Sequence, residues 1–247
     1  MCDICGCGQH EHRHDEHGAH GDHEDHGARM IEVQQSLLAA NEQQAASNRR
    51  HIEAMGAVAI NLISSPGSGK TTLLERTIDL LGETVRIGVI EGDLETERDA
   101  DRIRAKGVNA VQLTTGGACH LDAPMVHTGL HVLEHLGKGA GYDLIFIENV
   151  GNLVCPAAFD LGEHQRVILL SVPEGSDKPV KYPATFRTAD LVLLTKTDLL
   201  PYFDFSVEEA AGEASRLRPE APVLSLSATT GEGMDAWIDY LQGLLRR

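Results

Sequence analysis

Residues 64–71, which read Ser-Ser-Pro-Gly-Ser-Gly-Lys-Thr, have the composition of a phosphate-binding loop. They follow an apolar stretch typical of a strand, residues 57–63, and precede a helical pattern that begins near Gly69. In this setting, backbone N–H groups surround the phosphates of a nucleotide and the positive end of the helix faces them. We expect Lys70 to reach the β- and γ-phosphates and the Thr71 hydroxyl to bind Mg²⁺. Ser64 stands where the usual pattern, GxxxxGK[ST], has its first glycine.

A second motif, Thr195-Lys196-Thr197-Asp198, indicates which base is bound. A carboxylate at Asp198 can accept hydrogen bonds from N1 and N2 of guanine, a donor pair that adenine lacks. Thr195 replaces the more common Asn of this motif, and a later Ser227-Ala228 pair is similar to the last base-contacting loop of GTPases. The residues expected to contact the nucleotide are Gly67, Ser68, Gly69, Lys70, Thr71, Thr72, Thr195, Lys196, Asp198, Ser227 and Ala228.

Acidic residues follow two further apolar stretches. Asp93 comes after residues 85–90, and Glu148 ends the stretch 143–149 in an ExxG pattern. The carboxyl ends of parallel strands meet at one edge of a sheet, where ligands bind. We therefore expect Thr71, Asp93 and Glu148 to handle Mg²⁺, with Asp93 also able to orient the attacking water and to act with Lys70 in catalysis.

Three thiols lie within the first seven residues, at Cys2, Cys5 and Cys7. A Cys-x-x-Cys-x-Cys segment can surround one ion, and a free α-amino group can complete a planar set of nitrogen and sulfur ligands. Square-planar geometry suits Ni(II) or Cu(II), whereas a tetrahedral arrangement would suit Zn²⁺. A redox or adventitious thiol cluster is the alternative.

A histidine-rich tract follows these thiols, interleaved with Asp, Glu and Gly. Its histidines are His10, His12, His14, His17, His20, His23 and His26. The tract has no apolar periodicity, so residues 1–28 are predicted to be a disordered segment that binds metal ions. Imidazole suits Ni, Zn and Cu alike, and a purification tag is the alternative explanation.

A second candidate metal centre combines residues that are distant in the sequence. Cys119 and His120 follow a Gly-rich stretch, and Cys155 lies shortly after the Glu148 strand. Both loops are expected to emerge at the nucleotide edge of the sheet, where two thiolates and an imidazole would bind Zn²⁺ or Ni²⁺. The alternative is that each cysteine is a buried small apolar residue.

The composition limits the partners. The chain has 247 residues, of which 42% are apolar, enough for one sizeable core. A formal net charge of −16 argues against nucleic acid as a partner. No run of 18 apolar residues exists, so we expect no membrane-spanning helix. The five cysteines are an odd number, and the polar N-terminus does not resemble a secretory signal, so we expect a cytoplasmic protein that uses thiols for metal.

The remaining sequence alternates apolar strands with helices, which predicts a doubly wound α/β fold with a mostly parallel sheet. We expect residues 29–56 to form a connecting helical segment and residues 57–247 to form the nucleotide-binding domain. The expected strands are 57–63, 85–90, 109–113, 143–149, 166–172, 190–195 and 222–226. The expected helices are 30–55, as one helix or a pair, and 70–81, 95–106, 122–136, 179–187, 206–217 and 233–245.

Taken together, these motifs resemble the HypB family, the nickel-incorporation GTPases of [NiFe]-hydrogenase maturation. The resemblance covers essentially the whole chain. It rests on the thiol motif, the His tract and the stretches SSPGSGKTTLL, EGDLETERDADRI, TTGGACHLDA, ENVGNLVCPA, EGSDKPVKYP and SATTGEGM. The thiol motif and GNLVCP are the most specific of these.

The resemblance implies a metallochaperone that hydrolyses GTP slowly, binds Ni(II) and supports its insertion into hydrogenase. It implies a tight Ni(II) site at Cys2, Cys5 and Cys7 and a weaker Zn²⁺ or Ni²⁺ site at Cys119, His120 and Cys155. It further implies a GTP-dependent homodimer in which Lys181, or alternatively Lys178, approaches the partner's nucleotide. Nickel-delivery proteins and the hydrogenase large-subunit precursor would be its partners.

Three alternatives remain at this point. A urease nickel-accessory GTPase is similar in fold and shares the TKTD motif, but the chain has no CPH-type metal motif. A nickel storage protein with a residual nucleotide site is supported by the His tract alone. A cobalamin-type metallochaperone GTPase would carry a CxCC signature, which is absent.

Overall fold

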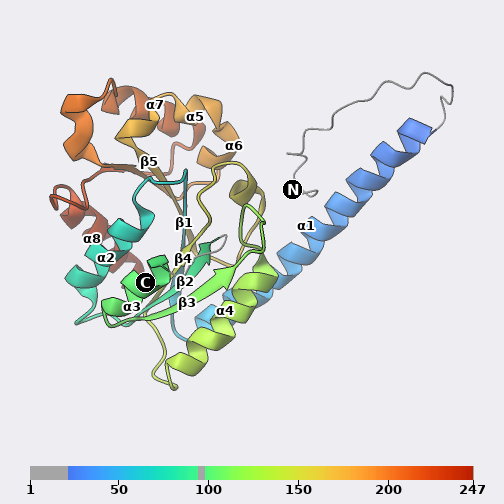
Figure 1. The fold of residues 1–247 in the computed structure, drawn as a ribbon, viewed down its shortest axis with the longest axis horizontal. Helices are drawn as coiled ribbons and strands as arrows, with labels where there is room; N and C mark the ends of the chain where they lie inside the picture. The colour runs from blue at the N-terminus through green and yellow to red at the C-terminus, as the bar shows by residue number, and fades with distance from the viewer. Residues whose placement is uncertain (1–21, 94–97, 247) are drawn as a thin grey trace.

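The structure of the protein, a computed structural model, describes residues 22–93 and 98–246 (Figure 1). Side chains are described from residue 35 onward. The predicted thiol site at Cys2, Cys5 and Cys7 and the side chains of the His tract therefore lie outside the described residues.

A parallel sheet of seven strands forms the centre of the protein, in the order β3-β2-β4-β1-β5-β6-β7. The strands are β1 (Val58–Ser64), β2 (Ile87–Asp93), β3 (Asn109–Thr114), β4 (Leu144–Glu148), β5 (Gln165–Ser171), β6 (Leu191–Thr195) and β7 (Val223–Ser225). Each predicted strand is present, and the predicted doubly wound α/β fold is confirmed.

Helices cover both faces of this sheet (Figure 1). The α-helices are α1 (Asp22–Ala54), α2 (Lys70–Leu81), α3 (Arg98–Ala105), α4 (Ala123–Leu136), α5 (Lys178–Lys181), α6 (Pro183–Phe186), α7 (Val207–Leu217) and α8 (Met234–Leu245). Three short 3₁₀ helices are η1 (Cys155–Ala158), η2 (Val172–Glu174) and η3 (Thr197–Tyr202). None of the helices within the described ranges is long and apolar enough to cross a membrane.

Successive strand residues point to opposite faces and so enter different cores. In β4, Leu144 and Phe146 join the core beneath α2, α3 and α8, whereas Ile145 and Ile147 join the core beneath α1 and α4. On the side of the sheet that α1 and α4 cover, α6 and α7 pack over β5 and β6. Strands buried on both faces explain the continuous apolar runs in the sequence.

Two helices differ from the sequence-based expectation. The predicted helix 179–187 is divided into α5 and α6 at Tyr182, whose φ and ψ are −125° and 52°. Pro183 follows, and proline disfavours the helical conformation of the residue before it. The helix expected from residue 30 begins at Asp22, so the predicted boundary between residues 28 and 29 falls within α1. A nucleated helix can be extended at little cost.

Two buried asparagines join α1 to the rest of the domain. The backbone N–H of Ala123 donates to Asn41, whose own amide donates to the carbonyl of Asp160. The Asn48 amide donates to the carbonyls of Ala123 and Leu161, at 2.8 and 3.0 Å. These bonds hold α1 against the start of α4 and the loop before β5.

We predict that Asn48→Ala lowers the free energy of unfolding by about 1–3 kcal/mol, because it leaves two buried carbonyl groups without their donor and also removes the bond from Gln44. Urea denaturation would measure the change. Gln43 is exposed on the same helix, and Gln43→Ala, the control, should stay within about 0.5 kcal/mol of the unsubstituted protein. If the two variants were equally stable, the docking of α1 would not depend on the Asn48 amide.

Candidate functional site

A cleft of about 440 Å³ opens at the carboxyl ends of β1, β2 and β4, on the predicted ligand edge of the sheet. The phosphate-binding loop forms one wall. Gly67 and Gly69 have φ of 74° and 95°, a left-handed conformation that favours glycine. A Cβ added at Gly151, the glycine of the ExxG pattern, would lie 2.8 Å from Cα of Pro66. Glycine at position 151 therefore lets the loop after β4 pack directly on the phosphate-binding loop.

Lys70 lies buried at the start of α2, as a phosphate-binding lysine should. Its ammonium group donates to the Ser64 hydroxyl at 3.0 Å. The serine that replaces the first glycine of the motif thus holds the lysine in place. Burial lowers the pKa of Lys70 below its usual value, although the nearby Glu148 opposes this effect.

Two buried carboxyl groups face Lys70 and Thr71. Glu148 accepts a hydrogen bond from the Thr71 hydroxyl at 2.9 Å. Glu91 is its neighbour across the β2–β4 pair. Burial, reinforced by Glu148, raises the pKa of Glu91 to about 9, and burial raises the pKa of Glu148 to about 7.

One carboxyl oxygen of Glu91 and one of Glu148 lack a hydrogen-bond partner. Buried carboxyl oxygens without partners, beside the Thr71 hydroxyl, are the oxygen ligands that Mg²⁺ prefers. The residues present therefore fit a magnesium ion that accompanies a nucleotide. The sequence did not predict a role for Glu91, because the predicted strand ended at residue 90 and only the pairing of β2 with β4 places Glu91 beside Glu148.

Asp93 also lines the cleft, at the end of β2, as predicted. Two residues of α3, Asp99 and Arg102, share this wall although the sequence analysis gave them no role. Arg102 donates to Asp99 at 2.8 Å and also pairs with Glu75 of α2. Both belong to the stretch EGDLETERDADRI, which was quoted for the family resemblance, so the motif itself pointed to these two residues.

Four of the predicted base-binding residues line a smaller pocket of about 60 Å³ that shares Gly69, Thr72 and Lys196 with the cleft; they are Thr195, Lys196, Ser227 and Ala228, and Asp198 lies behind this lining. The hydroxyl of Ser227, which lines this pocket, donates to the Asp198 carboxylate at 2.6 Å.

Two contacts tie the base-binding motif to the phosphate-binding loop. Lys196 donates to the carbonyl of Gly67 at 2.7 Å. The Thr195 hydroxyl donates to the carbonyl of Ser68 at 2.8 Å. Threonine thus makes a supporting contact to the loop even though it replaces the more common asparagine.

Cys119, His120 and Cys155 come together as predicted. One ligand atom from each lies within 4.8 Å of the other two. The His120 ring packs on Phe159, with 4.1 Å between ring centroids, and burial lowers the pKa of His120. A neutral imidazole beside two sulfur atoms is a donor set for Zn²⁺ or Ni²⁺.

This Cys-His-Cys cluster is connected to the cleft through Asn149, the residue after Glu148. The Asn149 side chain accepts a hydrogen bond from the backbone N–H of Leu121 at 3.1 Å. Leu121 in turn packs against the end of β2, where a Cβ added at Gly92 would lie 2.6 Å from Cγ of Leu121. The segment that carries Cys119 and His120 therefore contacts both strands that supply carboxylates to the cleft.

Lys178 and Lys181 do not line the described part of either pocket. Both lie on α5, where Lys181 pairs with Asp177 and Lys178 lies 5.2 Å from the centroid of the Tyr182 ring. Contact with a nucleotide on a second copy of the chain remains a prediction for either lysine.

The fold and the cleft define a P-loop nucleotide-binding protein. Residues 58–225 match the family described as CobW/HypB/UreG, nucleotide-binding domain. A hydrogenase maturation factor HypB of Azotobacter chroococcum mcd 1 is 54% identical over 215 residues, covering 87% of this chain and 69% of that relative. That of Escherichia coli (strain K12) is 50% identical over 214 residues, covering 87% and 72%. The chain belongs to the HypB family of hydrogenase maturation factors.

Solved structures agree with this assignment. HypB from Helicobacter pylori in complex with nickel superposes with a TM-score of 0.80 at 42% identity, covering 84% of this chain and 95% of that one. HypB from Archaeoglobus fulgidus gives a TM-score of 0.77 at 42% identity, covering 84% and 99%. The shared fold therefore extends over nearly the whole of the two solved relatives and over 84% of this chain.

We predict that Glu91→Gln stabilises the nucleotide-free and Mg²⁺-free protein at pH 8.5. The pKa of Glu91 is about 9 in the folded protein, against an ordinary value of 4.5. Between these values the folded state binds more protons than the unfolded state, so stability falls as the pH rises. Glutamine removes this loss, which should amount to about 1–2 kcal/mol between pH 7 and pH 8.5.

Urea denaturation at the two pH values would measure this difference. Glu83→Gln, at an exposed position, is the matched control and should keep the pH dependence of the unsubstituted protein. A Glu91→Gln variant with that same pH dependence would show that Glu91 is ionised in the folded state.

Proposed function

We propose that this protein is a GTP-hydrolysing nickel metallochaperone that supports nickel insertion into [NiFe]-hydrogenase. One observation carries the proposal: the cleft that holds the phosphate-binding loop and the Cys-His-Cys cluster lie at the same edge of the sheet and are joined through Asn149. A nucleotide site alone would support any P-loop enzyme, and a thiol cluster alone would support metal storage. Their physical connection supports a metal site that responds to the nucleotide.

Different residues of the cleft bind the base, bind the phosphates and orient the attacking water. Asp198 accepts from the guanine edge, and the backbone of residues 67–71 surrounds the phosphates. Lys70 neutralises charge on the phosphoryl group being transferred, and Asp93 orients the attacking water. When bound with GTP, Mg²⁺ supplies positive charge to the β- and γ-phosphate oxygens, and Thr71, Asp93 and Glu148 would hold it.

Nickel is the cargo in this proposal. Cys2, Cys5 and Cys7 bind it tightly, the His tract supplies a reservoir, and Cys119, His120 and Cys155 form the weaker site for Ni²⁺ or Zn²⁺. The donor set of the described cluster supports this role, as does the Helicobacter pylori relative solved in complex with nickel.

The active form is proposed to be a GTP-dependent homodimer in the cytoplasm. Lys181, or alternatively Lys178, then approaches the partner's nucleotide and adds positive charge, as cationic groups supplied in trans do in other GTPases. Val180 is 60% exposed. It lies next to Lys181, which the proposal assigns to the interface, and burial of this valine would favour association.

The delivery partners are proposed to be other nickel-carrying proteins and the hydrogenase large-subunit precursor. A relative from Helicobacter pylori (strain J99 / ATCC 700824), 42% identical over 211 residues, is named a hydrogenase/urease maturation factor. Urease maturation is therefore the second candidate. Nickel storage without turnover is the third, and GTP hydrolysis by the purified protein would exclude it.

We predict that Asp198→Asn weakens GTP binding by about 10- to 150-fold and shifts preference toward XTP. The amide can donate to the O2 carbonyl of xanthine but no longer offers two acceptors to guanine, and a hydrogen bond to a charged group contributes about 1.5–3 kcal/mol. Competition binding of GTP, XTP and ATP would measure the preference.

Asp204→Asn is the matched control, because Asp204 is an exposed carboxylate shortly after η3. It should leave nucleotide preference unchanged. Unaltered GTP preference in Asp198→Asn would remove Asp198 from the base site and with it the guanine specificity of the proposal.

We also predict that a non-hydrolysable GTP analogue changes the Ni²⁺ affinity of the Cys-His-Cys cluster by about 5- to 150-fold relative to GDP, a typical coupling of 1–3 kcal/mol. The assay uses the full chain with Cys2, Cys5 and Cys7 replaced by Ser. Thiolate-to-nickel absorption then reports only on Cys119 and Cys155.

Asn149→Ala should bring this ratio close to one, because it removes the link between Leu121 and the end of β4. Asn152→Ala is the control, since Asn152 contacts the carbonyl of Cys119 but has no described bond to β4. Asn152→Ala should change the Ni²⁺ affinity by the same factor with GDP and with the GTP analogue. Equal Ni²⁺ affinities with GDP and the analogue in the protein with intact Asn149 would contradict nucleotide control.

A further inference from the structure

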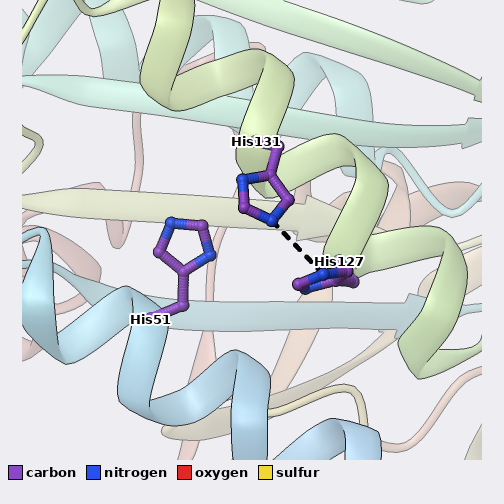
Figure 2. A group of neighbouring side chains, drawn as sticks. All are labelled: His51, His127 and His131. Atoms are coloured by element: carbon purple, nitrogen blue, oxygen red, sulfur yellow. Dashed lines mark hydrogen bonds between the residues drawn. The ribbon is translucent and has the colours of Figure 1, made fainter.

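A second group of imidazoles lies where α1 packs along α4, away from the nucleotide cleft. Figure 2 shows His51 of α1 with its ring directed toward His127 and His131 of α4. One ring nitrogen from each lies within 4.8 Å of the other two, and this group and the Cys-His-Cys cluster are the candidate ligand groups among the described residues. The tri-histidine group, as we name it, has no role in nucleotide binding.

The arrangement of its rings suits a shared ion. Nε2 of His127 and Nε2 of His131 are 3.2 Å apart, and the ring centroids of His51 and His131 are 4.8 Å apart. Two imidazole nitrogens on one tetrahedral ion, each about 2.0–2.1 Å from it, are about 3.3 Å apart. The two α4 nitrogens share a hydrogen bond of nearly this length, so an ion that replaced the proton between them would require little movement of either ring.

The position of two of the rings on α4 also suits a shared metal ion. Two histidines four residues apart lie on the same side of a helix. His127 and His131 can therefore offer their Nε2 atoms to one ion from the same helix.

A carboxylate supports the third imidazole. Oε2 of Glu134 lies 3.0 Å from Nε2 of His51. A carboxylate can only accept, so the imidazole donates, and carboxylates orient metal-binding histidines in this way.

We propose that His51, His127 and His131 bind one divalent ion of the nitrogen-preferring class, Zn²⁺ or Ni²⁺, with Glu134 orienting His51. The ion joins α1 to α4 and thereby ties the helix that follows the N-terminal Cys/His segment to the helix that follows Cys119 and His120. The site contains no thiolate and His131 is exposed, so it exchanges metal independently of the Cys-His-Cys cluster. The proposal does not require nucleotide binding.

Site-resolved acylation of histidines by diethyl pyrocarbonate, mapped by peptide mass spectrometry, tests this proposal on the full chain. Free Zn²⁺, and in a second series free Ni²⁺, is set with a metal buffer. A bound imidazole nitrogen cannot be acylated, so modification of His127 and His131 should fall together as the free ion concentration rises. His135 is exposed on the same helix, is not part of the group, and should keep its reactivity.

His51→Gln distinguishes a three-ligand site from a simple pair on α4. The loss of one ligand should raise the free ion concentration that half-protects His131 by at least about tenfold. Because His131 itself is largely exposed, His131→Gln is a second variant that should fold normally, confirmed by circular dichroism, and should abolish the protection of His127.

Two outcomes would overturn the proposal. The first is reactivity of His127 and His131 that does not depend on either ion. The second is equal protection of His131 in the His51→Gln variant and the unsubstituted protein, which would reduce the site to an adventitious pair on one helix.

Discussion

The burial of Lys70 beside two carboxyl groups is the constraint on which the rest of the site depends. Parallel strands bring Glu91 and Glu148 to one sheet edge, and the helix after β1 places Lys70 against them. Burial raises the pKa of both carboxyl groups, Glu148 raises that of Glu91 further, and Lys70 offsets only part of the rise at Glu148. A ligand that brings a cation and phosphates would give each of these buried groups a partner. Binding should consequently contribute directly to stability.

Departures from the usual motifs are accommodated by local contacts. Ser64 supplies a hydroxyl to Lys70, and Thr195 supplies one to the carbonyl of Ser68. Ser64 therefore adds a contact within the phosphate-binding loop that glycine could not make, and Thr195 supplies a contact to that loop in place of asparagine. The loop is further held by Ser68, whose hydroxyl donates to Glu174. A loop fixed from several sides in advance loses little conformational entropy when phosphates bind.

The sequence predicted the sheet well, because strands buried on both faces have a strong apolar signal and strand ends coincide with polar residues. It also predicted the Cys119, His120 and Cys155 group, since topology alone brings two loops to one edge. It did not predict Glu91 or the role of Asn149, because their importance depends on which strands are adjacent. The tri-histidine group required the docking of α1 on α4: the i, i+4 spacing of His127 and His131 was visible, but nothing local connects them to His51. The break at Tyr182 could have been predicted from Pro183, but the helical periodicity of residues 179–187 favoured one continuous helix.

The length of α1 has a consequence for the metal ligands that precede it. Its 33 residues span about 50 Å, and Figure 1 shows that its N-terminal part extends beyond the sheet. Residues 1–21 would cover at most about 70 Å if fully extended. The direction of α1 therefore decides which surroundings the residues before Asp22 can reach, so a small rotation of this helix would change their reach without altering any side chain that could bind metal.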